Sequence, residues 1–149
     1  MPEVRHKQTI DASIKVVWDF VKDMNNWAPY MMGYMQHEVI NEKESIWKLK
    51  STIIGVTYSF QMRVLITEWK EFQSVGFDLK GLTHPVEGKG LVKLVQAEKP
   101  AQTDVTFDLS LHGKGLATPI VNIVVAPLLK PMAEQLLTKI NAQLVKVPA

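Results

Sequence analysis

The stretch VTYSFQMRVLI, residues 56–66, decides the fold that we expect for this chain. Beginning with Val56, every second side chain is apolar, and those between are mainly polar. Successive side chains of a strand point to opposite faces, so this pattern predicts a long strand with one apolar and one solvent-facing side. The apolar side carries Tyr58, Phe60 and Met62, which are large or flexible side chains of the kind that line ligand cavities as well as cores.

Similar patterns predict further strands on both sides of this one, at residues 3–10, 37–41, 46–54, 75–80, 90–96 and 105–112. Gly55 predicts a tight turn between two of them. Two Gly-Lys-Gly triplets, at residues 88–90 and 113–115, lack the sequence context of a phosphate-binding loop. We therefore expect their glycines to serve turns that need a positive φ.

Helices are predicted at two places. Apolar residues at helical spacing predict a helix over residues 14–21, with Asp11 or Ser13 as its N-cap. Residues 23–30 predict a break and a second short helical turn. A long helix is expected within residues 115–147, with a kink or break near residues 126–130, because Pro127 and Pro131 each remove a helical hydrogen bond.

Composition narrows the class of protein. A chain of 149 residues with 46% hydrophobic and 21% charged residues is typical of one globular domain, residues 1–149. A net charge of +2 without a basic cluster argues against nucleic-acid binding. The absence of cysteine excludes disulfides and thiolate chemistry. Without a secretory signal or an apolar run long enough to span a bilayer, the chain is expected to be cytoplasmic.

The order of elements and several local motifs resemble the START-like, helix-grip (SRPBCC) superfamily, and within it the group of accessory proteins of carbon monoxide dehydrogenase. The resemblance rests on residues 10–27, 56–66, 77–81, 88–94 and 103–115. It implies an α+β fold, in which a curved antiparallel sheet of about seven strands surrounds a long C-terminal helix, with two short helices after the first strand. Members of the superfamily typically bind lipids, sterols, polyketides or other apolar molecules. The carbon monoxide dehydrogenase accessory group is associated with membrane recruitment or quinone handling for a redox enzyme.

The expected function is therefore binding and carrying of a hydrophobic small molecule, such as a lipid, a quinone or a polyketide-like compound, in an internal cavity. The predicted cavity walls are Tyr58, Phe60, Met62, Phe77, Leu79, Phe107 and Met132. The predicted cavity mouth is Tyr30, Met31, Met35 and His84. No metal-ligand spacing, nucleophile motif or cofactor-binding motif is present in the sequence, so no metal, cofactor or catalytic residue is assigned.

Two alternatives stay open. An enzyme of the cyclase, dehydratase or hydrolase type would need an inward-facing acid or base, for which only His6 and His84 are candidates. The uncharged run at residues 116–129 is either a buried helix start or an exposed surface. In the second case, residues 120–129, which begin with Ile120 and end with Leu129, would contact a membrane or a redox enzyme peripherally. The sequence does not indicate an oligomeric state.

Overall fold

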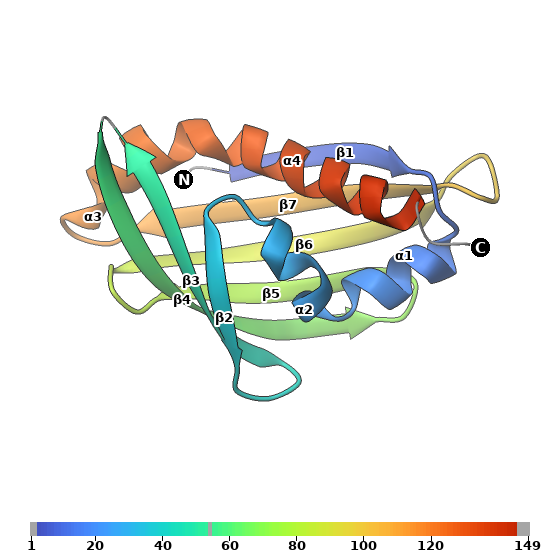
Figure 1. Cartoon of the computed structure of the whole chain (residues 1–149), viewed down its shortest axis with the longest axis horizontal. Coiled ribbons are helices and arrows are strands. Elements are labelled where there is room, and N and C mark those ends of the chain that lie inside the picture. Colours follow the sequence, from blue (N-terminus) through green and yellow to red (C-terminus); the bar gives the residue numbers. More distant parts are fainter. Residues whose placement is uncertain (1–2, 54, 146–149) are drawn as a thin grey trace.

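The computed structural model describes residues 3–53 and 55–145 (Figure 1). A seven-stranded antiparallel sheet has the order β1-β7-β6-β5-β4-β3-β2. Its strands are β1 (Glu3–Ile10), β2 (Tyr34–Val39), β3 (Glu44–Ile53), β4 (Val56–Lys70), β5 (Ser74–Gly81), β6 (Val86–Gln96) and β7 (Thr103–Gly113). The helical elements are α1 (Ile14–Val21), α2 (Met24–Trp27), the 3₁₀ turn η1 (Ala28–Tyr30), α3 (Ala117–Ile120), the π-helical η2 (Val121–Val125) and α4 (Ala126–Val145).

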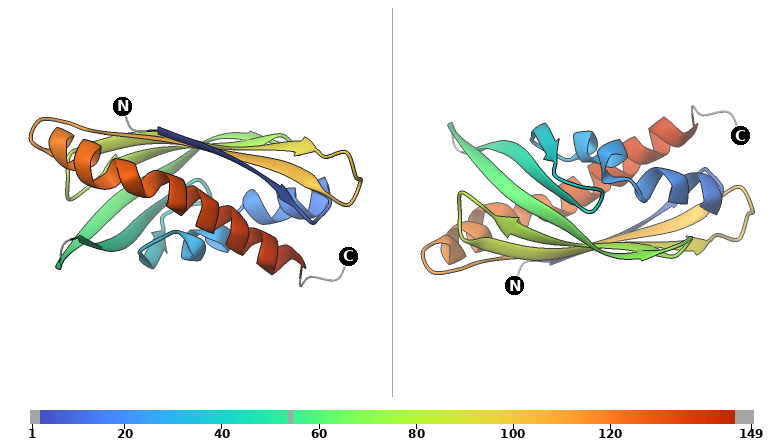
Figure 2. Two further views of the ribbon diagram at one scale, coloured as in Figure 1. Left: turned by 90° about the horizontal axis from the view of Figure 1, so that it is seen from above. Right: turned by 90° about the horizontal axis from the view of Figure 1, so that it is seen from below.

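The sheet is bent, and α4 runs across its concave face (Figures 1 and 2). The first and last strands, β1 and β7, are hydrogen-bonded neighbours, with Glu3 opposite Ser110 and Ile10 opposite Thr103. The short helices α1 and α2 lie on the same side of the sheet as α4 (Figure 2). This arrangement confirms the predicted helix-grip fold, including the two short helices after the first strand and the long C-terminal helix.

Strand β4 confirms the alternation that predicted it and continues four residues further, to Lys70. Toward its end Val64 and Ile66 are buried, whereas Val56 and Tyr58 at its start are 51% and 43% exposed. All four face the same side of the sheet, so the start of β4 extends beyond the cover that α4 provides. Gly55, with a φ of 75°, forms the predicted turn into β4. Residue 54, which the prediction included in the preceding strand, lies outside the described residues.

Five strands, β2, β3, β5, β6 and β7, begin earlier than predicted, and β6 corrects the interpretation of a glycine triplet. Strand β2 begins at Tyr34, and β6 begins at Val86, so that Gly88 and Gly90 lie inside β6 and not in a turn. A Cβ at position 90 would overlap the ring of Phe77 on the neighbouring strand. Gly90 is therefore needed because an aromatic ring lies against its backbone. In the second triplet Gly115 has a φ of 58°, as a turn glycine would.

The helices follow the predicted pattern closely, except near the prolines. Ser13 is the N-cap of α1, and its hydroxyl accepts a hydrogen bond from the backbone N–H of Val16 at 3.4 Å. No helix break lies within residues 126–130, because α4 begins at Ala126 and includes all of them. The irregular turn lies just before, in η2, which contains Ile123, the residue whose carbonyl the ring of Pro127 would otherwise approach too closely. A wider π-helical turn relieves that contact.

We expect Gly90→Ala to lower the free energy of unfolding by about 1–3 kcal/mol, because the added methyl group overpacks against Phe77. Urea denaturation of the wild type and the variant measures this difference. The same substitution in a Phe77→Leu background should cost clearly less, since the shorter side chain can move aside. An equal cost in both backgrounds would show that the ring is not the reason for the glycine.

Candidate functional site

A cavity of about 170 Å³ lies between the concave face of the sheet and the first half of α4. The inner faces of β3 to β7 supply most of its wall, α4 supplies Leu128, Leu129 and Met132, and the segment after η1 supplies Met31 and Met32. The side chains that line it are almost all apolar. The strands position these groups by their alternation, because every second residue of β4, β5 and β7 points toward the helix.

Aromatic side chains close the inner end of the cavity. Trp27 is buried and meets Trp47 edge to face, with 5.6 Å between the ring centroids. Its ring also lies 5.7 Å from that of Phe77, which stacks on Phe107 at 6.4 Å. The indole N–H of Trp27 donates to the carbonyl of Val21 at 2.9 Å. The N–H of Trp47 donates to the Ser45 hydroxyl at 2.7 Å. Both indole N–H groups are thus satisfied by the protein, which leaves this end apolar.

Two polar side chains of the cavity lining, those of Thr83 and His84, form what we call the polar rim. Lys50 and Gln61 also belong to the lining, but the alternation of β3 and β4 turns their side chains to the outer face of the sheet. The Thr83 hydroxyl accepts a hydrogen bond from the backbone N–H of Gln61 at 3.1 Å. It lies 3.0 Å from Nδ1 of His84, to which its own proton can be donated. The imidazole then carries its proton on Nε2. The His84 ring also packs against Phe60, 4.9 Å between centroids.

Most of the residues predicted for the cavity lie in its lining. These are Phe60, Met62, Phe77, Leu79, Phe107 and Met132 among the predicted walls, and Met31 and His84 among the predicted mouth residues. Residues that sequence reasoning did not assign to the wall include Trp27, Trp47, Leu109, Leu111 and Leu128. Leu109 and Leu111 continue the alternation of Phe107, so the same signal could have identified them. Gln61, Thr83 and Lys50 gave no such signal, because their positions depend on how the turns pack.

Three predicted residues lie outside the lining, each for a structural reason. Tyr58 is on the correct side of β4, but it is 43% exposed beyond the end of the helix cover. Tyr30 turns toward α1 and stacks on Phe20, 6.3 Å between centroids. Met35 is 42% exposed, at a register shift of β2 between Tyr34 and Gln36. Their assignment to the cavity wall or mouth is therefore corrected.

The two histidines considered as acid–base groups are placed differently. His6 is half-buried on β1, where its Nε2 lies 3.2 Å from the side-chain oxygen of Gln8, and it is not part of the cavity lining. His84 does line the cavity, at the polar rim. The described residues contain no group of three or more histidines and carboxylates close enough together to hold a metal ion.

The uncharged run at residues 116–129 is partly buried and partly exposed, so each of the two predicted alternatives holds for part of it. Leu129 is buried under the sheet at 2% exposure, whereas Leu116 and Ile123 are 94% and 74% exposed. The side chains of Ile120, Val121 and Val124 lie outside the described part of the structure. None of the helices described is both long enough and apolar enough to cross a membrane.

Two larger hollows, of about 450 and 790 Å³, lie on the outer face of the sheet. Most of the residues that line them alternate along the strands with those that line the cavity. They include charged side chains such as Arg63, Asp78 and Lys89. These hollows are shallow depressions between solvated side chains. The cavity under α4 is smaller, but it is the one whose walls could exclude water from an apolar molecule.

Comparisons with known proteins agree with this geometry. The family model described as polyketide cyclase / dehydrase and lipid transport matches residues 1–146. No curated protein matches the sequence. Among solved structures, a conserved protein from Geobacillus kaustophilus superposes with a TM-score of 0.81 at 18% identity, over 97% of this chain and 95% of that one.

Two further solved structures are similar in fold. A START superfamily protein from Mycobacterium smegmatis has a TM-score of 0.69 at 18% identity, over 95% of this chain and 98% of that one. The Zhui aromatase/cyclase from a Streptomyces species has a TM-score of 0.61 at 15% identity, over 92% of each chain. At these identities the likeness establishes the shared fold.

We expect benzene to bind in the cavity, because an apolar cavity of about 150 Å³ is known to stay dry and accept it. Saturating benzene should raise Tm by about 2–5 °C, as binding to the native state stabilises it. Leu128→Trp, which puts an indole into the lining, should abolish the shift. Leu65→Trp on the outer face of β4 is the matched control and should retain it. A shift of equal size in both variants would place the bound benzene elsewhere.

Proposed function

Because the chain belongs to the polyketide cyclase / dehydrase and lipid transport family, we propose that it binds a small apolar molecule in the cavity under α4. The observation that supports this most directly is the separation of apolar walls from a polar rim within one cavity. Transfer of an apolar group from water to such walls contributes about 25 cal/mol per Å² buried. The rim would fix the orientation of the ligand, because the side chains of Thr83 and His84 can both form hydrogen bonds with it.

The size of the cavity favours one class among the expected ligands. About 170 Å³ holds roughly one six-membered ring, judging by cavities of about 150 Å³ that hold benzene. A quinone ring would fit within the walls with a carbonyl oxygen at the rim, and its isoprenoid chain would extend outward. A full lipid tail or a fused polyketide would require the walls to move. Met31, Met32 and Met132 are flexible enough to allow some widening.

We propose, as a finer assignment, that such a ring is carried for a redox enzyme of the carbon monoxide dehydrogenase type. The support for this step is the resemblance of residues 10–27 and 103–115 to the accessory proteins of that enzyme, together with the ring-sized cavity. A lone ring-binding site suits a carrier, since release then requires only that the rim contacts and the apolar burial be reversed.

A second candidate function is acid–base catalysis on the bound molecule, as in cyclases or dehydratases. The observation in its favour is that His84 lies in the cavity lining with Nδ1 held by Thr83, an arrangement that orients the imidazole. Turnover of the bound molecule would then be lost in a folded His84→Ala variant.

Binding of a quinone ring can be measured directly, because Trp27 and Trp47 line the cavity and their fluorescence would be quenched. We expect a water-soluble short-chain quinone to quench part of the tryptophan emission saturably. Phe60→Ala removes a wall and should weaken binding about five- to tenfold, which corresponds to roughly 50 Å² less buried apolar surface.

The matched control is Leu65→Ala on the same strand, whose side chain is on the outer face. It should leave the quinone affinity unchanged. Native mass spectrometry of freshly purified protein provides an independent readout through the mass of any retained ligand. Equal quenching by Phe60→Ala and wild type, in a folded variant, would contradict the proposed site.

A further inference from the structure

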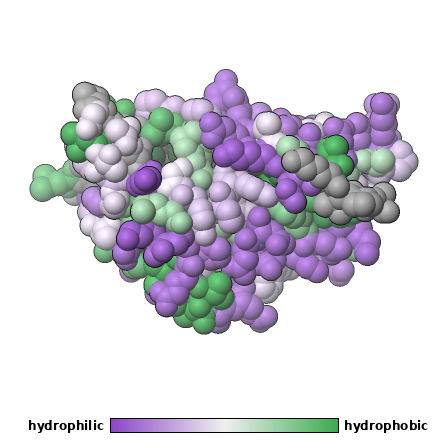
Figure 3. Space-filling view, in the orientation of Figure 1, coloured by the Kyte–Doolittle hydropathy of each residue, from purple (hydrophilic) through white to green (hydrophobic). Residues whose placement is uncertain are grey.

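One end of the molecule exposes an unusual number of large apolar side chains. We call this the rim end, and it comprises the β3–β4 turn, the β5–β6 loop and residues 114–123. The exposed fractions are 51% for Val56, 43% for Tyr58, 48% for Leu82, 94% for Leu116 and 74% for Ile123. Figure 3 shows apolar side chains at this end, over α3. Exposed apolar side chains that gather around a cavity mouth indicate an interaction surface.

Backbone hydrogen bonds join these segments to the polar rim. The N–H of Leu82 donates to the carbonyl of Gln61 at 2.8 Å, which ties the β5–β6 loop to β4. The N–H of Lys114 donates to the carbonyl of Pro85, also at 2.8 Å, which ties the same loop to the end of β7. Figures 1 and 2 show the β3–β4 turn, the β5–β6 loop and α3 at one end of the molecule in every view.

Acidic residues are also rare at the rim end. Residues 45–67, 79–86 and 109–133 form the rim end and the strands that lead to it, and they contain no aspartate or glutamate. They carry the cations Lys48, Lys50, Arg63, Lys80, Lys114 and Lys130. Of these, Arg63 is paired with Glu44 at the far end of β3. The nearest acidic residue to the loop, Glu87, is paired with Lys114 at 2.8 Å, and this hydrogen bond holds the pKa of Glu87 below its ordinary value.

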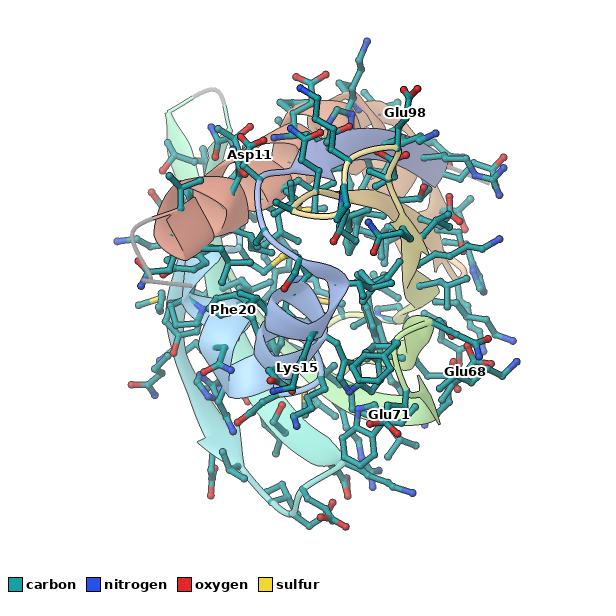
Figure 4. All side chains as sticks on the ribbon, turned by 90° about the vertical axis from the view of Figure 1, so that its right-hand side faces the viewer. Asp11, Lys15, Phe20, Glu68, Glu71 and Glu98 are labelled. Carbon is teal, nitrogen blue, oxygen red and sulfur yellow. The ribbon has the colours of Figure 1, made fainter. Side chains whose placement is uncertain are left out.

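The opposite end carries acidic side chains together with lysines that pair with some of them, as Lys70 does with Glu68. Figure 4 looks onto that end, where Asp11, Glu68, Glu71 and Glu98 lie around α1, with Lys15 between them. The molecule therefore has an apolar end with an excess of lysine at the cavity mouth, whereas the opposite end carries charges of both signs. In an electric field from a negative surface, this distribution would turn the rim end toward the surface.

We propose that the rim end docks on an anionic lipid bilayer, so that an apolar ligand passes between the bilayer and the cavity. This inference rests on the proposed function, because it concerns the route by which the ligand reaches its site. Leu116 and Ile123 enter the interfacial region of the bilayer, and Lys50 and Lys130 meet the lipid phosphates. Apolar burial and attraction to anionic lipid together are the two contributions that hold a protein at a membrane surface.

The charges also favour a bilayer over a second copy of the chain as the occupant. Two rim ends that face each other would bring the lysines of both copies together, and Glu87, the nearest acidic residue, is already paired with Lys114; like charges at close range repel. An anionic bilayer supplies the opposite charge over the whole surface. Its acyl region accepts the exposed leucine and isoleucine at the same time.

The test is co-sedimentation of the full chain with vesicles of equal parts phosphatidylglycerol and phosphatidylcholine, compared with vesicles of phosphatidylcholine alone. The wild type should bind the anionic vesicles, and high salt should weaken binding. Leu116→Ser combined with Ile123→Ser should reduce the bound fraction about tenfold or more, because two inserted apolar side chains are lost. Lys130→Glu should weaken binding to the anionic vesicles about fivefold or more, since it reverses one charge at the surface.

The matched control is Val39→Ser combined with Ile40→Ser, which removes two side chains that are 53% and 48% exposed away from the rim end, next to Glu38 and Glu42. It should bind vesicles as the wild type does. The proposal is overturned if the wild type ignores anionic vesicles, or if the control loses as much binding as the rim variant. It is equally overturned if sedimentation velocity shows a wild-type dimer that the rim variant disperses.

The quinone quenching measurement in the absence of vesicles separates this proposal from the proposed function. The variant at Leu116 and Ile123 should retain quinone binding, because neither residue lines the cavity. If the wild type binds the quinone but does not bind vesicles, the proposed cavity function is supported and the docking surface is rejected. Loss of quenching in that variant would show that these residues act on the cavity itself, which also contradicts the docking role.

Discussion

The packing of α4 against the concave face of the sheet is the interaction on which the rest of the structure depends. One face of the helix is buried there from Leu129 to Leu144, and Ala133 between them is completely covered. The covered side chains are Leu129, Ala133, Leu136, Leu137, Ile140 and Leu144. Burial of that stripe is the contribution that holds helix and sheet together, since most helical stability in proteins comes from the packing of an apolar face. The cavity lies where the same packing is incomplete.

The packing of α4 against the sheet is incomplete near the start of the helix, and this explains where the cavity lies. Toward the C-terminal half of α4, leucine and isoleucine side chains fill the space completely. Toward its start, Leu128 and Met132 are only partly buried. Aromatic side chains from the sheet line the space there without filling it. The prolines take part in this geometry, because the π-helical turn before Pro127 ends the regular helix close to the polar rim. Along the interface between α4 and the sheet, the packed core is thus followed by the cavity and then by the exposed rim end.

Much of the fold could be predicted from alternation and spacing alone. The strands β1 and β4, the helix α1 with its Ser13 cap and the turn at Gly55 were all visible in the residues themselves. The side of the sheet to which Phe60, Phe77 and Phe107 point was visible too, because alternation is a local property of a strand. The bounds of β2 and β6 were harder to predict, since glycines such as Gly90 weaken the strand signal while serving a packing need.

The sequence by itself determined which residues face inward; only the tertiary structure decided what each of them meets there. Tyr58 and Phe60 have the same alternation and similar side chains, yet Phe60 lines the cavity and Tyr58 is exposed, because α4 covers one and not the other. Likewise, nothing in the residue types predicts that Thr83 and His84 meet Gln61 at the cavity rim. Periodicity fixes direction within one strand, whereas contacts depend on the distance between elements that are far apart in the chain.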